Sequence, residues 1–427
     1  MDFKHLTSSQ FDVMNFLNEV AMNFPQAISF ASGRPNEEFF SPDKWFTQFD
    51  TFREYFATKH NLSEQATLNA IAQYGRTAGC INELISQQLR IDESIQCSSK
   101  QILITNGCQE AMAILLMAGC KGKVLLVTDP TYIGITGLAS ILGIEIISVS
   151  SQSELISAKN VQLAFEQVKL ENKEVGGLYI IPDFDNPSGE SFSSELRNEL
   201  LEVCNELKIA IFEDNPYGRF RYDGGGVTTM YEMDKFGVVY HLGSFAKTVC
   251  PTMRIGYILC PTVDFIGRGY QEILDNLSKV KSLLSVNTSQ LAQAVVGGIL
   301  LENDCSLEQL NGKARTFYRS NRDTMLEALE VEFSDMKEYV SWNNPEGGFF
   351  LTVKLPFIFD KHQMEICASE YDVLVMPRAF FSVAETQDEF VRFAFSYVSP
   401  ELIKKGIKSF ARYVRTTMNK AGVLTNV

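Results

Sequence analysis

Two patterns of apolar residues divide the chain. In the first, between about residue 100 and residue 260, short runs that are apolar throughout alternate with stretches of helical periodicity. Seven such runs lie at 102–105, 123–128, 144–149, 177–182, 209–213, 238–242 and 255–259. Uninterrupted apolar runs of this length are typical of parallel strands that helices cover on both faces. We therefore predict an α/β fold with a mostly parallel seven-stranded sheet and helices on both faces.

Helical spacing of apolar residues marks most of the remaining chain. We expect helices at 63–73, 79–90, 109–118, 133–142, 195–207, 264–283, 289–301 and 306–332. The N-terminal segment also shows helical spacing, with apolar residues at Phe11, Met14, Leu17 and Val20.

The last hundred residues have a mixed pattern that indicates a smaller α+β domain. Strands are expected at 338–342, 348–354, 373–376 and 391–395, followed by an amphipathic helix from Ser399 to Arg415. We predict three parts: residues 1–45 belong with the small domain, 46–315 form the large domain, and 316–427 complete the small domain.

Charge and composition exclude several classes of protein. The 427 residues contain 38 Lys and Arg against 52 Asp and Glu, a net charge of −14, which argues against nucleic acid or anionic membrane as a partner. No apolar stretch approaches the length of a membrane span, and the N-terminus shows no signal-peptide pattern. The nine cysteines lack C-x-x-C spacing and the four histidines lack metal-ligand spacing. We expect a cytoplasmic protein with reduced thiols and no metal.

Lys247 lies just after an apolar run, in the segment SFAKT, and Arg254 follows seven positions later. Ser244, Thr248 and Arg254 would form a phosphate cradle beside the lysine amine. A lysine next to such a cradle suits a Schiff base with a phosphorylated aldehyde cofactor. A solvated surface lysine in a turn is the alternative interpretation.

Polar residues also follow two other apolar runs. Asp214 comes directly after 209–213, where a buried carboxylate needs a positive partner such as a protonated pyridine nitrogen. Tyr217 and Asn186 are suited to hydrogen-bond a phenolic oxygen on the same ring. The alternatives are a helix N-cap for Asp214 and a turn former for Asn186.

Three further positions are candidates for binding. Residues 105–109 (TNGCQ) lie between a strand and a helix, where backbone N–H groups are suited to bind phosphate, although any turn between a strand and a helix has this pattern. Tyr132, after another run, is suited to stack on a flat heterocycle, although tyrosine is more often plain packing. Arg392 lies inside an apolar run and needs a carboxylate, which is either a structural Asp or Glu or the carboxylate of a substrate.

These motifs occur together in one order between about residue 28 and residue 413. The stretches are ISFASGRPNEEFFSP, QYGRTAGCINELI, ILITNGCQEAM, DPTYIGI, IPDFDNPSGES, FEDNPYGRF, GSFAKTVCPTMRIGY, PEGGFFL and VRFAFSYVSPE. The chain thus resembles a fold-type I pyridoxal-phosphate enzyme of the class I/II aminotransferase family, nearest in pattern to the 2-aminoadipate/kynurenine/aromatic aminotransferase branch. The resemblance implies pyridoxal 5'-phosphate as cofactor, transfer of an amino group between an amino acid and a 2-oxo acid, and a homodimer with shared active sites.

The resemblance also implies a role for each matching residue. Lys247 would form the internal aldimine and carry protons, Asp214 would pair with the pyridine nitrogen, and Tyr132 would stack on the ring. The phenolic oxygen would be bound by Asn186 and Tyr217. The phosphate would be held by Ser244, Arg254, the backbone at Cys108 and Gln109, and Tyr74 of the neighbouring subunit. The substrate would meet Arg392, Gly33, Asn186 and Arg34.

The chain departs from the family pattern at Ala246, Arg378 and Arg34, where relatives often have Ser, Gly and an aliphatic residue. Arg34 is suited to bind a side-chain carboxylate or to stack on an aromatic ring, and an exposed or structural arginine is the alternative. A second enzyme hypothesis is another pyridoxal-phosphate reaction, namely decarboxylation, elimination or oxidation. A third is a transcription regulator with an aminotransferase-like domain, for which the N-terminal segment leaves no room.

Overall fold

The computed structural model describes residues 20–150, 156–383 and 386–420, and its centre is a seven-stranded sheet. The strands are β2 (Ile102–Thr105), β3 (Val124–Val127), β4 (Glu145–Ser148), β5 (Val175–Ile180), β6 (Ile211–Asp214), β7 (Val239–Ser244) and β8 (Gly256–Leu259). Their order across the sheet is β2-β8-β7-β6-β5-β3-β4. Only β8 runs antiparallel to its neighbours among these strands, so the predicted mostly parallel sheet of seven strands is confirmed.

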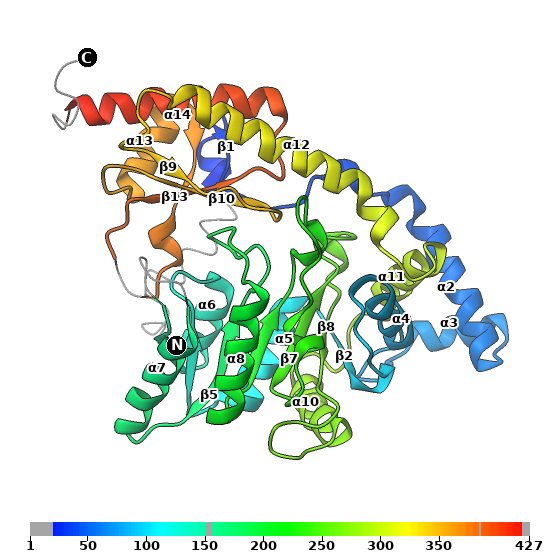
Figure 1. The fold of residues 1–427 in the computed structure, drawn as a ribbon. Coiled ribbons are helices and arrows are strands. Elements are labelled where there is room, and N and C mark those ends of the chain that lie inside the picture. Colours follow the sequence, from blue (N-terminus) through cyan, green and yellow to red (C-terminus); the bar gives the residue numbers. More distant parts are fainter. Residues whose placement is uncertain (1–19, 151–155, 384–385, 421–427) are drawn as a thin grey trace, which may run out of the picture.

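Helices cover both faces of the sheet, as the apolar strands require (Figure 1). One face packs against α5 (Cys108–Leu115) and α10 (Tyr270–Leu284), with α6 (Ile133–Ile141) beside α5. The other face packs against α7 (Ala158–Leu170) and α9 (Met230–Met233), with α8 (Ser194–Leu207) between them in sequence and in contact with both. The sheet is therefore the middle layer of three, and the carboxyl ends of the strands are the edge at which parallel sheets of this kind bind ligands.

A second group of helices packs beside β2 and β8. It consists of α2 (Trp45–His60), α3 (Glu64–Ala72), α4 (Asn82–Glu93) and α11 (Gln290–Glu302). Two glycines let α11 approach α2 closely. A Cβ at Gly298 would lie 1.8 Å from the carbonyl oxygen of Gln48, and a Cβ at Gly297 would lie 2.5 Å from the ring of Phe52.

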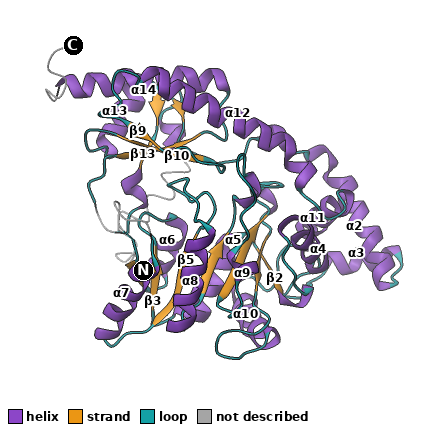
Figure 2. Cartoon of the chain, in the orientation of Figure 1, coloured by secondary structure: helices purple, strands orange, loops and turns teal. Residues whose placement is uncertain are grey.

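A smaller lobe lies across the edge formed by the carboxyl ends of the parallel strands (Figures 1 and 2). Its antiparallel strands are β9 (Ser341–Trp342), β10 (Phe350–Lys354), β12 (Met376–Pro377) and β13 (Phe390–Ala394), and β1 (Ile28–Ser29) pairs in parallel with β11 (Val373–Leu374). The helices of this lobe are α12 (Glu308–Glu332), α13 (Lys361–Tyr371) and α14 (Pro400–Lys420). Pairing of β1 with β11 brings the segment around residue 30 into this lobe.

Short irregular turns complete the described structure. They are η2 (Glu37–Phe39), η3 (Pro42–Lys44), η4 (Ser99–Gln101), the π-helical turn η5 (Leu116–Cys120), η6 (Gly218–Phe220), η7 (Pro251–Met253) and η8 (Arg378–Phe381). Among the described helices, none is long and apolar enough to cross a membrane.

Most predicted elements agree with the structure, and the differences have local causes. The helix expected from residue 264 begins at Tyr270, because the Asp264 carboxylate accepts the N–H groups of Ile266 and Arg268 and closes a turn. The strand expected at 373–376 is two short strands. Helices α2, α7, α9 and α13 were not predicted. Residues 20–23 are helical, whereas Phe11, Met14 and Leu17 lie outside the described residues. The predicted domain boundaries stay a prediction, and residue 315 lies within α12.

Candidate active site

The carboxyl ends of β5, β6 and β7, the start of α5 and the small lobe enclose a cavity of about 300 Å³. The sequence-predicted site residues that line it are Gly33, Arg34, Cys108, Gln109, Tyr132, Asn186, Asp214, Tyr217, Ser244, Lys247, Arg254 and Arg392. Tyr74 does not line the cavity, and its side chain is 78% exposed. The fold therefore brings together residues from seven separate stretches of the chain.

Lys247 lies in the turn after β7 and projects its amine into the cavity. Its Nζ donates a hydrogen bond of 2.9 Å to the carbonyl oxygen of Gly33. Burial, together with repulsion from Arg392 and Arg254, lowers the pKa of Lys247 from 10.5 to about 8. Gly33 must be glycine here, because a Cβ would lie 2.1 Å from the ring of Phe350. Because its pKa is lowered, the Lys247 amine is partly neutral near physiological pH.

Asp214 ends β6 at the floor of the cavity and is 3% exposed. Its Oδ2 accepts 2.7 Å from the hydroxyl of Tyr179, and its Oδ1 accepts 3.1 Å from the thiol of Cys108. Burial raises the pKa of Asp214, and the two donors act in the opposite direction. The sequence did not single out Tyr179, because its proximity to Asp214 depends on the register of β5 against β6, which aligns Tyr179 with Phe212.

The start of α5, whose first residue Cys108 contacts Asp214, is suited to an anion. The free N–H groups at the start of α5 follow Gly107, which has a φ of +75°. Arg254 donates 3.4 Å to the carbonyl oxygen of Asn106, just before that helix. Close approach needs glycine again, since a Cβ at Gly107 would lie 2.4 Å from Arg254 Nη2. A helix N-terminus, an exposed guanidinium and the Ser244 hydroxyl together favour phosphate.

Arg392 lies inside β13 and is 3% exposed. Its Nη1 donates 2.8 Å to Asn186 Oδ1, and its Nη2 donates to the carbonyl oxygen of Ala31. Nε is buried and has no hydrogen-bond partner among the residues that the structure describes. The guanidinium carbon lies 4.6 Å and 4.5 Å from the ring centroids of Phe350 and Phe381.

Burial lowers the pKa of Arg392 to about 9. Within the described part of the chain, none of the ion pairs includes Arg392, so the sequence-based alternative of a structural Asp or Glu partner finds no support there. A buried guanidinium that lacks an anion is unfavourable by itself, and a carboxylate that enters the cavity would relieve this cost.

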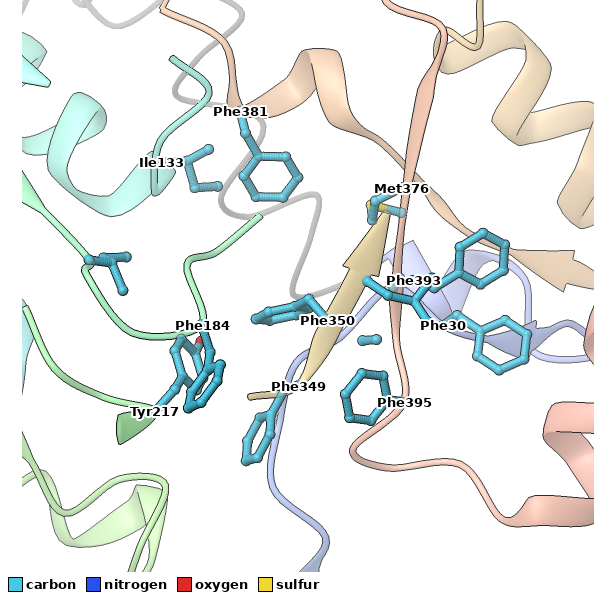
Figure 3. Packing of buried hydrophobic residues seen from close by; sticks show 14 of the residues in the cluster. Phe30, Ile133, Phe184, Tyr217, Phe349, Phe350, Met376, Phe381, Phe393 and Phe395 are labelled. Atoms are coloured by element: carbon cyan, nitrogen blue, oxygen red, sulfur yellow. The ribbon is translucent and has the colours of Figure 1, made fainter. Parts of the chain in front are cut away.

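Aromatic residues line the rest of the cavity. Tyr132 lies beside Gln109, and its hydroxyl is 3.4 Å from Gln109 Oε1. Tyr217 packs edge-on against Phe349 and Phe350, with centroid distances of 5.3 Å and 5.7 Å (Figure 3). The sequence did not single out Phe350, Phe381 and Ile133 as cavity residues, because nothing in their local pattern separates them from ordinary core residues.

Two arginines at positions where the chain departs from the family pattern have different environments. Arg34 is exposed at the rim, and its guanidinium carbon lies 3.7 Å from the ring centroid of Tyr397. Arg378 does not line the cavity. It forms a buried ion pair of 2.7 Å with Asp388 and stacks on Phe390. Arg378 is therefore accounted for by structural contacts, whereas Arg34 remains available at the entrance.

The arrangement fits pyridoxal phosphate. The group is a flat pyridine with a phosphate at one end, an aldehyde for an amine and a ring nitrogen that can be protonated. The cavity offers a group for each of these features: an anion cradle, a partly neutral lysine amine and a buried carboxylate. The orphaned Nε of Arg392 adds a place for a second anion, which suits the carboxylate of an amino acid.

Comparisons with known proteins agree with this chemistry. The family model described as aminotransferase class I and II matches residues 50–410. A (S)-3,5-dihydroxyphenylglycine transaminase from Amycolatopsis orientalis is 35% identical over 411 residues, which cover 96% of this chain and 92% of the relative. The bovine mitochondrial kynurenine/alpha-aminoadipate aminotransferase is 26% identical over 429 residues, covering 94% and 95% of the two chains. The crystal structure of kynurenine aminotransferase from Pyrococcus horikoshii superposes with a TM-score of 0.83 at 27% identity, covering 98% of this chain and 97% of that one.

Proposed function

Because the chain belongs to the family of class I and II aminotransferases, we propose that it transfers the amino group of an aromatic amino acid to a 2-oxo acid, with Lys247 as the residue that binds the cofactor. Its reaction class is that of the family, a transamination that depends on pyridoxal phosphate and has fold type I as its scaffold. The residue assignments and the aromatic substrate are the proposal.

One observation carries the proposal. A lysine amine with a pKa of about 8 and a buried arginine without a carboxylate partner in the described structure line one cavity. Burial disfavours the charged form of both groups. The aldehyde of the cofactor would react with the lysine amine, and the carboxylate of an amino acid would pair with the arginine. Arg392 would bind the α-carboxylate and thereby place the substrate Cα beside Lys247.

Each side chain then has a task that follows from its place. When bound, pyridoxal phosphate supplies an aldehyde for the amino group and a ring that accepts electron density. Lys247 Nζ would take the proton from the substrate Cα and deliver it to C4′, the carbon of the cofactor's aldehyde group. This role requires an amine that is neutral part of the time. Asp214 would hold a proton on the ring nitrogen. Arg254, Ser244 and the start of α5 would hold the phosphate.

The cavity wall supports an aromatic substrate side chain. Ile133, Phe350 and Phe381 come from three separate segments and line the cavity with apolar surface. The names of two relatives support the same substrate class, since one acts on a dihydroxyphenylglycine and the other on kynurenine. An aromatic side chain would remove this surface from water, whereas a small polar one would leave it exposed.

A single-turnover experiment tests the substrate class. We expect phenylglycine, phenylalanine and tyrosine to convert the absorbance of the bound cofactor to that of pyridoxamine phosphate at least about tenfold faster than alanine does, the scale of burying a few methylene groups. Return of the original absorbance without pyridoxamine phosphate would indicate another pyridoxal-phosphate reaction. Equal rates for aromatic and small amino acids would contradict the aromatic assignment alone.

We also propose that the protein is a homodimer with shared active sites. Tyr74 is exposed and outside its own cavity, and Gln290 at the start of α11 donates to the carbonyl oxygen of Gln73 next to it. Exposed apolar side chains lie near this position at the end of α10, in the following loop and at the start of α11. They are Leu283, Leu284, Val286 and Leu291. A second copy that covered them would bring its own Tyr74 to the neighbouring cavity.

All nine cysteines are free thiols, which supports a cytoplasmic location.

A further inference from the structure

The carboxylate of Asp214 is held by two side chains from different elements. Tyr179 of β5 donates 2.7 Å to Oδ2, and Cys108, the first residue of α5, donates 3.1 Å to Oδ1. Tyr179 is completely buried and Asp214 nearly so. One donor thus binds each oxygen, which restricts rotation of the carboxylate where Asp214 lines the cavity.

Both donors stabilise the charged form of Asp214. Burial raises the pKa of this carboxyl group, and the hydrogen bonds from Tyr179 and Cys108 act against that shift. Burial and the neighbouring Asp214 also raise the pKa of the Tyr179 phenol and the Cys108 thiol well above their usual values. Both shifts favour the protonated forms, in which the phenol and the thiol are hydrogen-bond donors.

We propose that Tyr179 and Cys108 are positioning residues that keep Asp214 ionised and aimed at the ring nitrogen of the cofactor. The inference rests on the role of Asp214 given under the proposed function and extends it to two residues that do not act on the substrate. Without these donors, a protonated Asp214 would no longer hold a positive charge on the ring.

The experiment compares Tyr179→Phe, Cys108→Ala and the double variant with a matched control. Tyr240→Phe is that control, because Tyr240 on β7 is buried and shares a sheet face with Tyr179, each being paired with Phe212 from opposite sides. The hydroxyl of Tyr240 does not contact Asp214 in the described structure. Cys108→Ser keeps a donor at the position and tests whether the donor or the sulfur matters.

Two readouts separate positioning from packing. The first is the ¹⁵N chemical shift of the ring nitrogen in protein reconstituted with ¹⁵N-labelled pyridoxal phosphate, which reports whether that nitrogen is protonated. The second is kcat against KM with an aromatic amino acid. The free energy of one hydrogen bond to a charged group corresponds to a change of about 10- to 100-fold in rate. We therefore expect kcat to fall by that factor in Tyr179→Phe, with KM changed less than about threefold.

We expect the ring nitrogen to shift toward its unprotonated value in Tyr179→Phe and further in the double variant. Cys108→Ser should retain more activity than Cys108→Ala. With a cofactor analogue that has carbon in place of the ring nitrogen, wild type and Tyr179→Phe should have the same residual rate. Unchanged ring protonation in both Tyr179→Phe and Cys108→Ala, or the same loss with the analogue as with the natural cofactor, would overturn the proposal.

Asp214→Ala distinguishes failure of this inference from failure of the proposed function. If Asp214→Ala is inactive while Tyr179→Phe and Cys108→Ala behave like Tyr240→Phe, only the positioning role is wrong. If Asp214→Ala keeps normal turnover, the role of Asp214 itself is wrong, and the positioning role falls with it.

Discussion

The ionisable residues of the cavity owe their chemistry to burial. Lys247 is the clearest case, since desolvation and two neighbouring guanidinium groups lower the pKa of its amine to about 8. At pH 7.5 roughly a quarter of such amines are neutral, against about one in a thousand for an ordinary lysine. Only the neutral form attacks an aldehyde, so the environment makes Lys247 reactive at a pH where exposed lysines are not.

Capture of the cofactor by Lys247 should depend on pH. The rate at which the apoprotein captures pyridoxal phosphate should rise with pH up to about 8 and then level off, because the fraction of neutral Lys247 follows that pKa. Stopped-flow absorbance measures the rate, and borohydride reduction should place the label on the peptide that contains Lys247. A rate that climbs steadily to pH 10, or a label on another lysine, would contradict the assignment.

The two arginines of the cavity should differ in what they recognise. Arg392 is buried and lacks a carboxylate in the described structure, whereas Arg34 is exposed at the rim. We expect Arg392→Leu to lower kcat/KM for every amino acid. The drop should correspond to a loss of about 2–5 kcal/mol in transition-state stabilisation, the scale for truncating a buried charge pair. Arg34→Leu should cost a similar amount only for substrates with a second carboxylate. Equal losses for acidic and aromatic substrates in Arg34→Leu would return Arg34 to a structural role, held by its stacking on Tyr397.

At the scale of elements, the start of α5 is fixed by a buried ion pair. Glu110 accepts 2.6 Å from the N–H of Asn106 and 2.9 Å from Lys281 Nζ of α10. Lys281 is completely buried and also donates to Ser285 and Thr288. The pair therefore ties the loop that precedes α5, and with it the anion cradle, to the neighbouring helix.

Lys281→Met should destabilise the protein by about 3–5 kcal/mol, because it leaves the Glu110 carboxylate without its cation. Urea unfolding measures the change, and Lys281→Met with Glu110→Gln should recover part of it. Lys173→Met is the control, since Lys173 pairs with Glu145 at the surface and should cost less than about 1 kcal/mol. Similar costs for the two single variants would mean that burial does not matter here.

The same pair has a pH dependence with a definite sign. Burial raises the pKa of Glu110, but hydrogen bonds from Ser285, the Asn106 N–H and Lys281 outweigh it, and the net pKa lies below the usual 4.5. A depressed pKa in the folded state contributes stability above pH 4.5 that disappears as pH falls through the folded value. We expect the difference in the free energy of unfolding between wild type and Glu110→Gln, measured by urea unfolding, to shrink as the pH falls below 4.5.

At the scale of the whole molecule, the proposed homodimer would complete the active site. Tyr74 lies on the surface near α11, away from the cavity of its own chain. The family resemblance assigns this tyrosine to the phosphate of the neighbouring subunit. Each cavity of the dimer would then need residues from both chains.

Complementation tests this arrangement. Lys247→Ala and Tyr74→Ala should each be nearly inactive as homodimers. Hybrids that pair the two variants should regain up to about half of one dimer's activity, because one cavity then holds an intact lysine and an intact tyrosine. Native mass spectrometry confirms the hybrids. An active monomer at high dilution, or no gain in proven hybrids, would rule out shared sites.

Features that depend on nearby residues could be predicted from the sequence. The run 102–105 coincides with β2, and the other six runs overlap the remaining strands, because continuous apolar runs need burial on both faces wherever they lie. The motifs after the strands likewise indicated the polar residues of the cavity, since parallel strands present their carboxyl ends at one edge of the sheet. Sequence thus determined the seven strands, the α/β class and most of the residues that line the site.

The tertiary structure decided whatever depends on the relation between distant segments. The antiparallel direction of β8 and the strand order are not written in any single run. The contact of Tyr179 with Asp214 follows from the register of β5 and β6, and Arg392 meets Asn186 only because the small lobe lies across the sheet edge. The local sequence pattern determines which residues must be buried. Strand pairing and packing determine which buried residues contact one another, and the chemistry of this site depends on those contacts.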